Sequence, residues 1–523
     1  MTLATPVLPE TLPAIAARAA RLWPDKAALI DGGRTWTFAG LHTQVRRAAA
    51  AYLTWGIHKG DVVALWAPNR IEWIVAALGA QAAGAILTPL NTRLKGREAA
   101  DILHRSRARL LVTMGHFLGV DYPALLAGET LPALQGIVTL DGNRPGGWEA
   151  FLERGPGPDD PAVDEAMARV TGQDPSDILF TSGTTGAPKG VVSGHLQTIR
   201  LFQAWSDAVD LRADDRMLII NPFFHTFGYK AGWLAALMMG ATSLPLAQFD
   251  MVEVARLIRE EGVSFLPGPP TIFQSLLAEQ HRLGTDRTSL RVAVTGAATV
   301  PPILVARMQT ELGFQRVVTG YGMTECGAIA MCRAGDSVDR IATTCGQALD
   351  GLEVVCADDQ GQPLSPGETG EILVRGFGVM QGYLDDPAAT AEAIDTKGWL
   401  HTGDIGTLDA DGYLRITDRK KDMYITGGFN CYPAEIEKLL CAHPKVEMAA
   451  VIGVPDDRLG EVGRAYLVLR PGEQAEAADI ITWSKANMAN YKVPRSVVFL
   501  DSLPKNAAGK VMRKDLKVAC PGS

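Results

Sequence analysis

The sequence predicts an α/β protein with more than one domain, and two observations carry this prediction. The chain has 523 residues, of which 47% are hydrophobic, so it is longer than a usual single domain and has ample material for a core. Helical patterns also alternate with short β-branched runs along most of its length. Such alternation is typical of βα units and predicts largely parallel sheets.

The alternation begins near the N-terminus. Residues 9–23 have helical spacing, and the apolar runs at 26–30 and 61–66 are predicted to be buried strands. The most apolar long stretch, 73–90, is interrupted by glycine, Gln81 and Pro89. It therefore predicts a buried helix running into a strand and not a membrane span. The same helix-to-strand rhythm recurs at 97–113, 251–270 and 301–322.

The pattern changes in the last third of the chain. From about 330 to 418, short strands are separated by turn signals, which predicts a smaller antiparallel module. Helix-to-strand pairs return at 433–454 and 478–500, so a further unit is expected there. The charged stretch 417–426 is the best candidate for a linker.

Composition excludes several classes of protein. Acidic residues outnumber basic ones by 58 to 50, and no window is strongly basic, which argues against a nucleic-acid binder. The seven cysteines are scattered without metal spacing, so neither a disulfide framework nor a zinc site is expected. The first residues lack the features of a signal peptide and no transmembrane segment is predicted, so a cytoplasmic enzyme is expected.

One loop carries an unusual density of small hydrogen-bond donors. Residues 178–190 are ILFTSGTTGAPKG, with strand-like residues on both sides. Glycine lets the backbone approach a ligand closely, and amides with hydroxyls form a concavity suited to phosphate oxygens. The loop does not match the Walker pattern GxxxxGK[ST], and a flexible surface turn is the alternative. The candidate phosphate-binding residues are Thr181, Ser182, Gly183, Thr184, Thr185, Gly186 and Lys189.

The string TSGTTGAPKG resembles the phosphate loop of the adenylate-forming superfamily, which comprises acyl- and aryl-CoA synthetases, luciferases and nonribosomal peptide adenylation domains. The resemblance continues in the family's order along almost the whole chain, so the protein is identified as a member. The matching strings are YGMTE (321–325), TGE (369–371), GYL (382–384), GWLHTGDIG (398–406), DRKKDMYITGGFNCYPAEIE (418–437) and PKNAAGK (504–510).

The resemblance implies both an architecture and a reaction. The expected N-terminal domain, 1–418, has two doubly wound sheets and a small β-barrel within 330–418, and a smaller mobile α+β domain covers 419–523. A carboxylate attacks the α-phosphate of MgATP to give an acyl-adenylate and pyrophosphate, and coenzyme A then takes the acyl group. The expected partners are a small carboxylic acid, ATP, Mg²⁺ and coenzyme A. Homodimers are common in the family, so a homodimer stays open.

The family pattern assigns roles around ATP. The loop holds the β- and γ-phosphates, Thr324 contacts the α-phosphate, and Glu325 with Thr184 holds Mg²⁺, which prefers hard oxygen ligands. Without the family, Glu325 would be an exposed acid at a helix start. The residues expected around adenine and the acyl pocket are Tyr321, Gly322, Met323, Gly296, Ala297 and Ala298.

The ribose is expected to bind Asp404, whose carboxylate accepts hydrogen bonds from both hydroxyls, together with Arg419. Without the family, Asp404 would be an ordinary turn residue. Lys510 is the expected adenylation catalyst, because a cation placed at developing negative charge is a large electrostatic effect; by composition alone it is one of several tail lysines.

The matching hinge residue is Lys421, about which the C-terminal domain rotates between the two half-reactions. The rotation is expected to present Gly427, Gly428 and Phe429 to the pantetheine channel, where glycine allows close approach.

The acid itself is less well specified. His225 matches a gating residue at the mouth of the acyl pocket, with a buried core histidine as the alternative. Lys230 is either a contact to a polar group of the substrate or a surface lysine. Stretches 221–232, 265–277 and 294–301 resemble a subgroup of bacterial CoA ligases acting on propanoate side chains left by steroid degradation.

Other interpretations stay open at this point. The acid is alternatively a medium-chain fatty acid or an aryl acid. A luciferase-type oxygenase, a ligand-binding relative without activity and an enzyme that loads a carrier protein are further hypotheses. The string TGAAT at 295–299 replaces the family's commoner GGAP, and its small residues leave room for a bulky acid without naming it.

Overall fold

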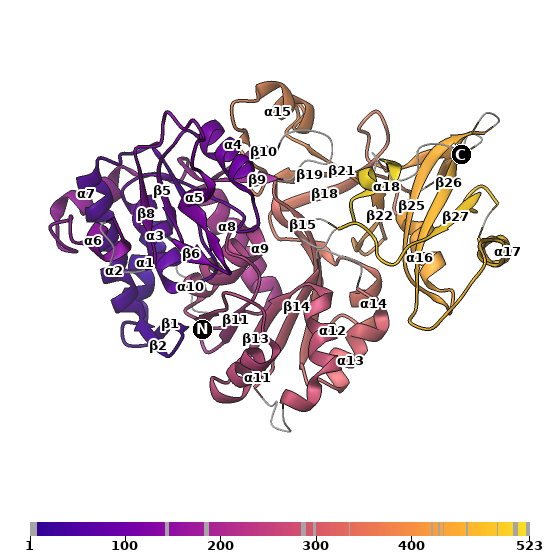
Figure 1. Ribbon diagram of the computed structural model, residues 1–523, viewed down its shortest axis with the longest axis horizontal. Helices are drawn as coiled ribbons and strands as arrows, with labels where there is room; N and C mark the ends of the chain where they lie inside the picture. The colour runs from indigo at the N-terminus through magenta and orange to yellow at the C-terminus, as the bar shows by residue number, and fades with distance from the viewer. Residues whose placement is uncertain are drawn as a thin grey trace. The chain divides into compact units, whose positions relative to one another are not determined.

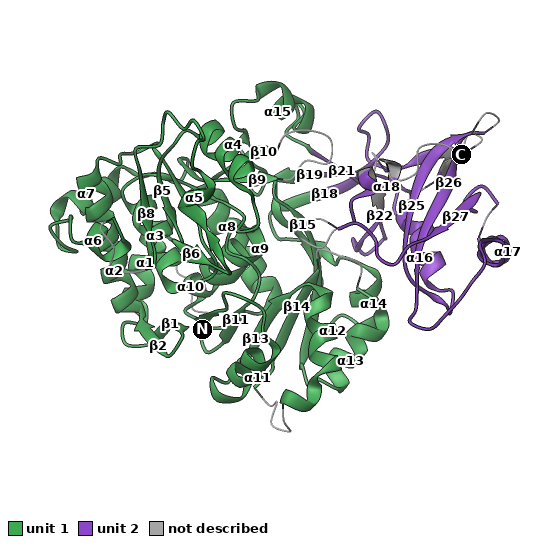
Figure 2. Cartoon of the chain, viewed as in Figure 1, with its two compact units in different colours: residues 1–353, 374–400 green, residues 354–373, 401–523 purple. Residues whose placement is uncertain are grey.

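The computed structural model describes residues 8–141, 146–181, 188–283, 289–296, 300–333, 335–419, 422–426, 429–431, 433–456, 459–488, 490–505 and 511–518. The chain forms two compact units, coloured separately in Figure 2. Unit 1 comprises 1–353 and 374–400, and unit 2 comprises 354–373 and 401–523.

The larger sheet of unit 1 has nine described strands, parallel in the centre and antiparallel at both edges (Figure 1). Its central strands are short and apolar on both faces, as expected where helices cover both sides of a parallel sheet. In spatial order the strands are β17 (Gln347–Ala348), β16 (Gly327–Met331), β15 (Arg316–Met323), β14 (Val292–Gly296), β13 (Phe265–Gly268), β11 (Arg216–Ile219), β12 (Thr242–Pro245), β1 (Ala27–Asp31) and β2 (Arg34–Thr37).

A second sheet of unit 1 has seven described strands; it is antiparallel at one edge, formed by its first two strands, and parallel from there to the other edge. All five residues of its central strand β3 are buried. In spatial order the strands are β20 (Gly382–Tyr383), β10 (Lys189–Gly194), β9 (Pro175–Thr181), β4 (Ile86–Pro89), β3 (Val62–Trp66), β5 (Ala108–Thr113) and β8 (Gly136–Thr139). A separate hairpin pairs β6 (His116–Phe117) with β7 (Val120–Asp121).

Two helices lie between these sheets. Helix α3 (Ile71–Ala82) contacts β1 of the larger sheet and β3 and β4 of the smaller one, and all its residues are buried. Helix α8 (His195–Val209) contacts both β16 and β10. A helix that is apolar on all sides has to be enclosed by protein, and the two sheets enclose α3.

The remaining helices of unit 1 lie on the sheets or connect them. They are α1 (Leu12–Leu22), α2 (Phe38–Trp55), α4 (Gly96–Ser106), α5 (Tyr122–Leu125), α6 (Trp148–Leu152), α7 (Pro161–Arg169), α9 (Thr226–Gly228), the π-helix η1 (Tyr229–Leu234), α10 (Ala235–Met239), α11 (Met251–Glu260), α12 (Pro270–Ala278), the 3₁₀ helix η2 (Gln280–Leu283), α13 (Pro302–Thr310), α14 (Val338–Thr343) and α15 (Pro387–Ala393).

Unit 2 contains most of a four-stranded sheet and all of a five-stranded one. The first consists of β18 (Leu352–Ala357), β19 (Gly370–Gly376), β21 (Leu400–Leu408) and β22 (Leu414–Arg419). The second consists of β24 (Phe429–Cys431), β23 (Tyr424–Thr426), β26 (Gly460–Leu469), β25 (Val446–Asp456) and β27 (Ser496–Phe499). Its helices are α16 (Pro433–Cys441), α17 (Ala477–Asn487) and α18 (Arg513–Val518).

The five-stranded sheet has an apolar core on each face. In β25, Val451 belongs to one core with residues of α16 and α17, whereas its neighbours Ala450 and Ile452 belong to the other with Leu516 of α18. Successive side chains of a strand point to opposite faces. An uninterrupted apolar run is therefore the pattern that a sheet covered on both faces requires.

The structure confirms the predicted α/β class, with a large N-terminal part and a smaller C-terminal part. The apolar stretch from Trp73 forms α3 and then β4, both buried. The stretch from 330 to 418 supplies the four-stranded sheet, but β17 and β20 within it complete the edges of the two parallel sheets, which the sequence did not predict. In the part of the chain that the structure describes, no helix has both the length and the apolarity needed to cross a membrane.

Candidate active site

The predicted phosphate loop connects two antiparallel strands, as the flanking residues indicated. Thr181 ends β9 and Lys189 begins β10, and the two residues face each other in the register of this pair. The hydroxyl of Thr181 donates to the carbonyl of Lys189 over 3.4 Å. Ser182, Gly183, Thr184, Thr185 and Gly186 lie outside the described residues. The loop therefore starts and ends on a fixed pair of strands.

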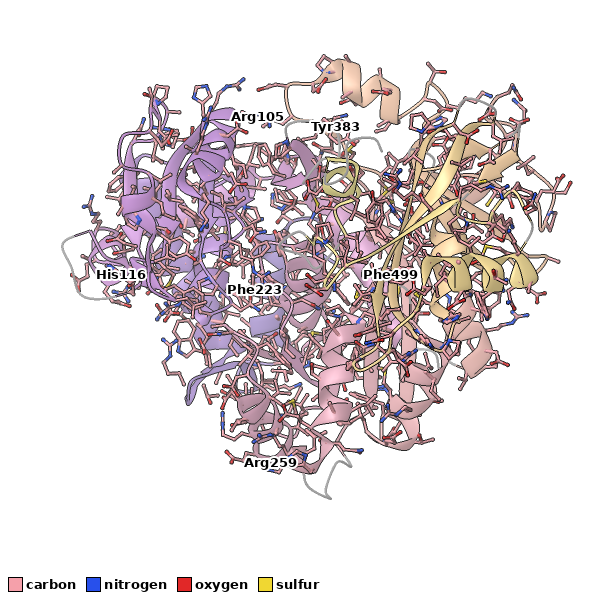
Figure 3. All side chains as sticks on the ribbon, turned by 45° about the vertical axis from the view of Figure 1, so that its right-hand side comes forward. Arg105, His116, Phe223, Arg259, Tyr383 and Phe499 are labelled. Carbon is pink, nitrogen blue, oxygen red and sulfur yellow. The ribbon has the colours of Figure 1, made fainter. Side chains whose placement is uncertain are left out.

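Arg105 of α4 holds the end of this loop. Its guanidinium donates to the carbonyl of Pro188 and lies over the ring of Phe180, 5.4 Å from the ring centre. Figure 3 labels Arg105 and Tyr383, which lie on two elements beside the base of the loop. No sequence pattern marked Arg105, because one arginine on an amphipathic helix resembles any exposed cation.

The motif YGMTE ends one strand and forms a turn to the next. Tyr321, Gly322 and Met323 are the last residues of β15, and Thr324 and Glu325 lie in the turn before β16. Glu325 is therefore in a strand-to-strand turn, and its alternative interpretation as an acid at a helix start is wrong. Gly296 ends the neighbouring parallel strand β14 opposite Gly320, at the carboxyl ends of parallel strands where α/β folds bind ligands. Ala297 and Ala298 lie outside the described residues.

Tyr383 connects two of the predicted site residues. Its hydroxyl donates to Oε1 of Glu325 over 2.9 Å, and Nζ of Lys189 lies 4.8 Å from the centre of its ring. Burial and the charge of Glu325 raise the pKa of Tyr383, so its hydroxyl stays protonated and remains a donor. The sequence showed this residue only as the middle letter of GYL, with no role attached.

Glu325 suits a hard cation. Among its contacts with the described residues, Oε1 accepts the hydrogen bond from Tyr383, and Oε2 accepts none. A carboxylate oxygen is a ligand that Mg²⁺ prefers. The residues present therefore fit the metal that the sequence implied, with Glu325 as the described ligand and Thr184 outside the described residues.

His225 lies between β11 and α9. Its side chain is exposed to solvent, and its Nδ1 accepts a hydrogen bond from the amide of Phe227 over 3.2 Å. Surrounding protein atoms nevertheless lower the pKa of His225. The exposure means that the alternative, a histidine buried in the core, is not what the structure contains.

The elements after His225 rest on a buried aromatic cluster. Tyr229 stacks on Trp233 with ring centres 5.1 Å apart, and Trp73 of α3 packs edge-on against Phe223 at 5.3 Å. Figure 3 labels Phe223, whose side chain is fully buried. Aromatic pairs of this geometry stabilise beyond their area, so the backbone that carries His225 has a rigid support.

Lys230 is not a surface lysine, and that interpretation is wrong. It lies in the π-helix η1 with 3% of its surface exposed, and its Nζ is 2.8 Å from Oδ1 of the fully buried Asp177. Asp177 belongs to β9, the strand that leads into the phosphate loop, and its other oxygen accepts from Ser176 at 2.7 Å. Buried charges occur in proteins almost only when paired, and this pair links the His225 region to the loop's strand.

In unit 2, the two residues predicted to bind ribose occupy paired positions on neighbouring strands. Asp404 of β21 and Arg419 of β22 are register partners in an antiparallel pair. Asp404 lies in a strand and is 7% exposed, so its alternative interpretation as a turn residue is wrong. Its amide donates to the hydroxyl of Thr402 over 3.1 Å.

The other unit 2 residues of the prediction are described only in part. Phe429 is the first residue of β24, whereas Lys421, Gly427, Gly428 and Lys510 lie outside the described residues. Arg513, three positions after Lys510, donates to Asp422 at 2.8 Å and to Glu437 of α16 at 2.8 Å. These contacts fix the start of α18 against α16, and no sequence signal indicated them.

Two parts of the chain match known protein families. Residues 16–384 match the family described as AMP-binding enzyme, and residues 435–510 match the AMP-binding enzyme C-terminal domain. The chain belongs to this adenylate-forming family. It is an ATP-dependent acyl-CoA ligase that works through an acyl-adenylate, and ligases of this family use Mg²⁺ with ATP and coenzyme A.

Individual relatives match over nearly the full length. The chain is 49% identical to the 3-[(3aS,4S,7aS)-7a-methyl-1,5-dioxo-octahydro-1H-inden-4-yl]propanoyl:CoA ligase of Rhodococcus jostii (strain RHA1), covering 97% of this chain and 98% of the relative. It is 50% identical to the ligase of the same name from Mycobacterium tuberculosis (strain ATCC 25618 / H37Rv), with the same coverage. Among solved structures, the anthranilate CoA ligase AuaEII in complex with anthranoyl-AMP is 28% identical with a TM-score of 0.86, covering 98% of both chains.

Proposed function

We propose that this acyl-CoA ligase activates a bicyclic, steroid-derived propanoate, the 3-(7a-methyl-1,5-dioxo-octahydroinden-4-yl)propanoate named for its two bacterial relatives. The observation that carries the proposal is identity of 49% and 50% to those ligases over 97% of the chain. The structurally similar aryl-acid ligase is only 28% identical. A common fold accommodates many acids, so sequence identity through the whole chain is the stronger guide to the acid.

The residues around ATP are proposed to act mainly by placing positive charge and aligning the reactants. Lys189 would neutralise phosphate charge and the loop amides would donate hydrogen bonds to the phosphate oxygens. Glu325 would hold Mg²⁺, which supplies further positive charge when bound, and Thr324 would contact the α-phosphate. Phosphoryl-type transfer depends chiefly on such positioning and charge stabilisation. The strand pair β9–β10 and the turn after β15 support this assignment, because they hold Lys189 and Glu325 on two sides of one tyrosine ring.

The nucleoside and the second half-reaction are assigned by the same reasoning. Tyr321 stacks on adenine, and Asp404 accepts from the ribose hydroxyls with Arg419 opposite it. Lys510 approaches the carboxylate during adenylation, Lys421 is the hinge, and the segment of Gly427, Gly428 and Phe429 meets coenzyme A. A dedicated cation at developing charge accounts for the choice of Lys510.

The acyl group is proposed to bind beside His225. This residue is exposed, and the π-helix behind it is fixed by the aromatic cluster and by the Lys230–Asp177 pair. π-helical turns occur often at functional sites. A rigid wall suits a fused-ring acid, because a rigid ligand loses little conformational freedom on binding.

The proposal is tested by pyrophosphate release with MgATP over a panel of acids, with and without coenzyme A. The panel contains the bicyclic propanoate, straight-chain acids from C4 to C16 and benzoates. Preference for the bicyclic acid, measured as kcat/KM and dependent on coenzyme A for turnover, is the expected result. Preference for straight chains or benzoates would keep the ligase and reject the steroid-derived acid. Light emission or oxygen uptake would instead favour luciferase-type chemistry.

A further inference from the structure

We propose that Tyr383 is a positioning residue for the metal site: its hydroxyl aims the carboxylate of Glu325 at Mg²⁺, and its ring separates that carboxylate from Lys189. This inference rests on the proposed function, because it takes Glu325 as the magnesium ligand. Tyr383 itself contacts neither the metal nor the phosphates in this proposal. It acts through the two residues that do.

The hydrogen bond sets the orientation of Glu325. The Tyr383 hydroxyl donates to Oε1 over 2.9 Å. This bond restricts rotation of the carboxylate and leaves Oε2 as the oxygen that binds the metal in our proposal. Mutation of a partner that orients a metal ligand typically lowers metal affinity by about 10–100-fold. A free carboxylate would have to give up rotational freedom on binding the metal, whereas this one has already done so.

The ring keeps two opposite charges apart. Nζ of Lys189 lies over the face of Tyr383 at 4.8 Å from its centre, while Glu325 is bound at the hydroxyl edge. In the described part of the chain, neither Lys189 nor Glu325 forms an ion pair within 4.0 Å. If these two groups met directly, their ion pair would compete with the metal for the carboxylate and with phosphate for the ammonium.

The backbone of Tyr383 is fixed at both ends, which gives the side chain a defined place. The amide of Met380 donates to the carbonyl of Glu325 over 2.8 Å. The amides of Gln381 and Leu384 donate to carbonyls of β10 over 2.9 and 2.7 Å. The segment 380–384 thus connects the turn that carries Glu325 with the strand that begins at Lys189.

Two further contacts hold the backbone of Tyr383 in place. The amide of Tyr383 donates to the hydroxyl of Thr390 over 2.9 Å, which ties β20 to α15. Tyr383 and Val191 are register partners at the edge of the seven-stranded sheet. A two-residue strand at a sheet edge contributes little to the core. The contacts of the Tyr383 side chain with Glu325 and Lys189 are therefore not explained by core packing. Positioning the metal ligand and the loop lysine explains them.

The test compares Tyr383→Phe with Tyr383→Leu. The phenylalanine keeps the ring and removes the hydroxyl, so the Mg²⁺ concentration for half-maximal ATP binding is expected to rise about tenfold. At saturating Mg²⁺, ATP affinity should then return close to that of the wild type. The leucine also removes the surface that holds Lys189, so ATP affinity should stay weaker even at saturating Mg²⁺.

Binding is measured by titration calorimetry of the full chain with ATP over a range of Mg²⁺ concentrations. This readout needs no acid, so it is independent of whether the bicyclic propanoate is the substrate. Tyr122→Phe is the matched control, because its hydroxyl donates over the same 2.9 Å to a carbonyl, that of Thr92, in the same unit. The control should leave the Mg²⁺ dependence unchanged.

A double-mutant cycle decides whether Tyr383 acts through Glu325. Glu325→Gln, Tyr383→Phe and the double variant are compared by the Mg²⁺ concentration for half-maximal ATP binding. Strongly non-additive effects are expected, because residues in contact couple. Additive effects, or an unchanged Mg²⁺ dependence in a folded Tyr383→Phe, would overturn the proposal and leave only a structural hydrogen bond.

Discussion

At the scale of single residues, the ion pair Lys230–Asp177 is buried, so both charges have lost their contact with water. Removing two charges from water is expensive, and their mutual attraction repays it only with good geometry. Lys230→Met would leave Asp177 charged and buried without its partner. We expect this variant to lose about 3–5 kcal/mol of unfolding free energy, measured by urea denaturation.

The matched control is the double variant Asp177→Leu with Lys230→Met, which removes both charges. It should recover most of the lost stability, because apolar residues of similar size often replace a buried ion pair at little cost. A double variant less stable than Lys230→Met would contradict this account of the pair.

His195 gives the fold a pH dependence. It is 1% exposed at the start of α8, and its Nδ1 accepts from the amide of Leu12 over 3.3 Å, which requires a neutral ring. Burial lowers the pKa of His195 to about 4, from 6.5 for an exposed histidine. Below pH 6.5 the unfolded chain takes up a proton that the folded chain does not, so stability falls as the pH drops from 6.5 to 4. This difference corresponds to about 3 kcal/mol.

The measurement is the unfolding free energy of the wild type and of His195→Asn between pH 7 and pH 4. The asparagine retains an acceptor for Leu12 but does not titrate in this range. Its stability should therefore fall less steeply than that of the wild type, by the amount that His195 contributes. Parallel curves for the two proteins would show that His195 titrates normally in the folded state.

The predicted ligands lie in recognisable sequence strings, whereas the residues that contact them in the fold do not. Thr181, Lys189, Glu325 and Asp404 belong to strings whose order along the chain marks a family, and each lies on a strand or turn that presents it. Tyr383, Arg105 and Lys230 contact Glu325, the end of the loop and strand β9 from distant positions in the sequence. A side chain's partner across a fold has no local pattern, so only the structure could reveal these contacts.

At the scale of elements, hydrophobic periodicity predicted the helix-to-strand pairs at 97–113, 251–270 and 301–322 but neither of the long helices α2 and α8. It failed for short elements such as β20 and the π-helix η1, because two to six residues cannot display a period. The edge strands β17 and β20 are also set by pairing with distant strands and not by their own sequence.

Helices α2 and α3 pack closely at Gly79. A Cβ atom on this glycine would lie 2.5 Å from Cβ of Ala48, far inside normal contact. In Gly79→Ala, overpacking costs about 1–3 kcal/mol, against a gain of about 1 kcal/mol in helix propensity. Because the neighbouring atom is fixed to the backbone of α2, we expect a net loss of stability in thermal unfolding.

Ala48→Gly in the Gly79→Ala background provides the control, since it returns the removed space to the interface. The double variant should be more stable than Gly79→Ala despite the helix propensity lost at residue 48. If it is less stable, close approach of the two helices is not what requires glycine at residue 79.

At the scale of the whole molecule, the two half-reactions are expected to depend differently on the hinge. Lys421→Pro restricts the backbone φ angle at the proposed hinge. Adenylate formation should stay largely intact, while transfer of the acyl group to coenzyme A should fall strongly. Both are followed on the same enzyme, by pyrophosphate release and by thioester formation, with Lys421→Ala as the freely rotating control. Equal loss of both half-reactions in Lys421→Pro would refute the hinge assignment.

The order of strands in the larger sheet has a consequence for how the chain is made. Strands β1 and β2 leave the ribosome first, yet β1 pairs in parallel with β12, which is synthesised roughly 200 residues later. At usual rates of translation this interval is about 10–40 s. Throughout that time the edge of β1 that later pairs with β12 has no partner strand, and an unpaired strand edge is a template for wrong pairing. The edge of β1 therefore has to stay protected until residues 242–245 of β12 have been synthesised.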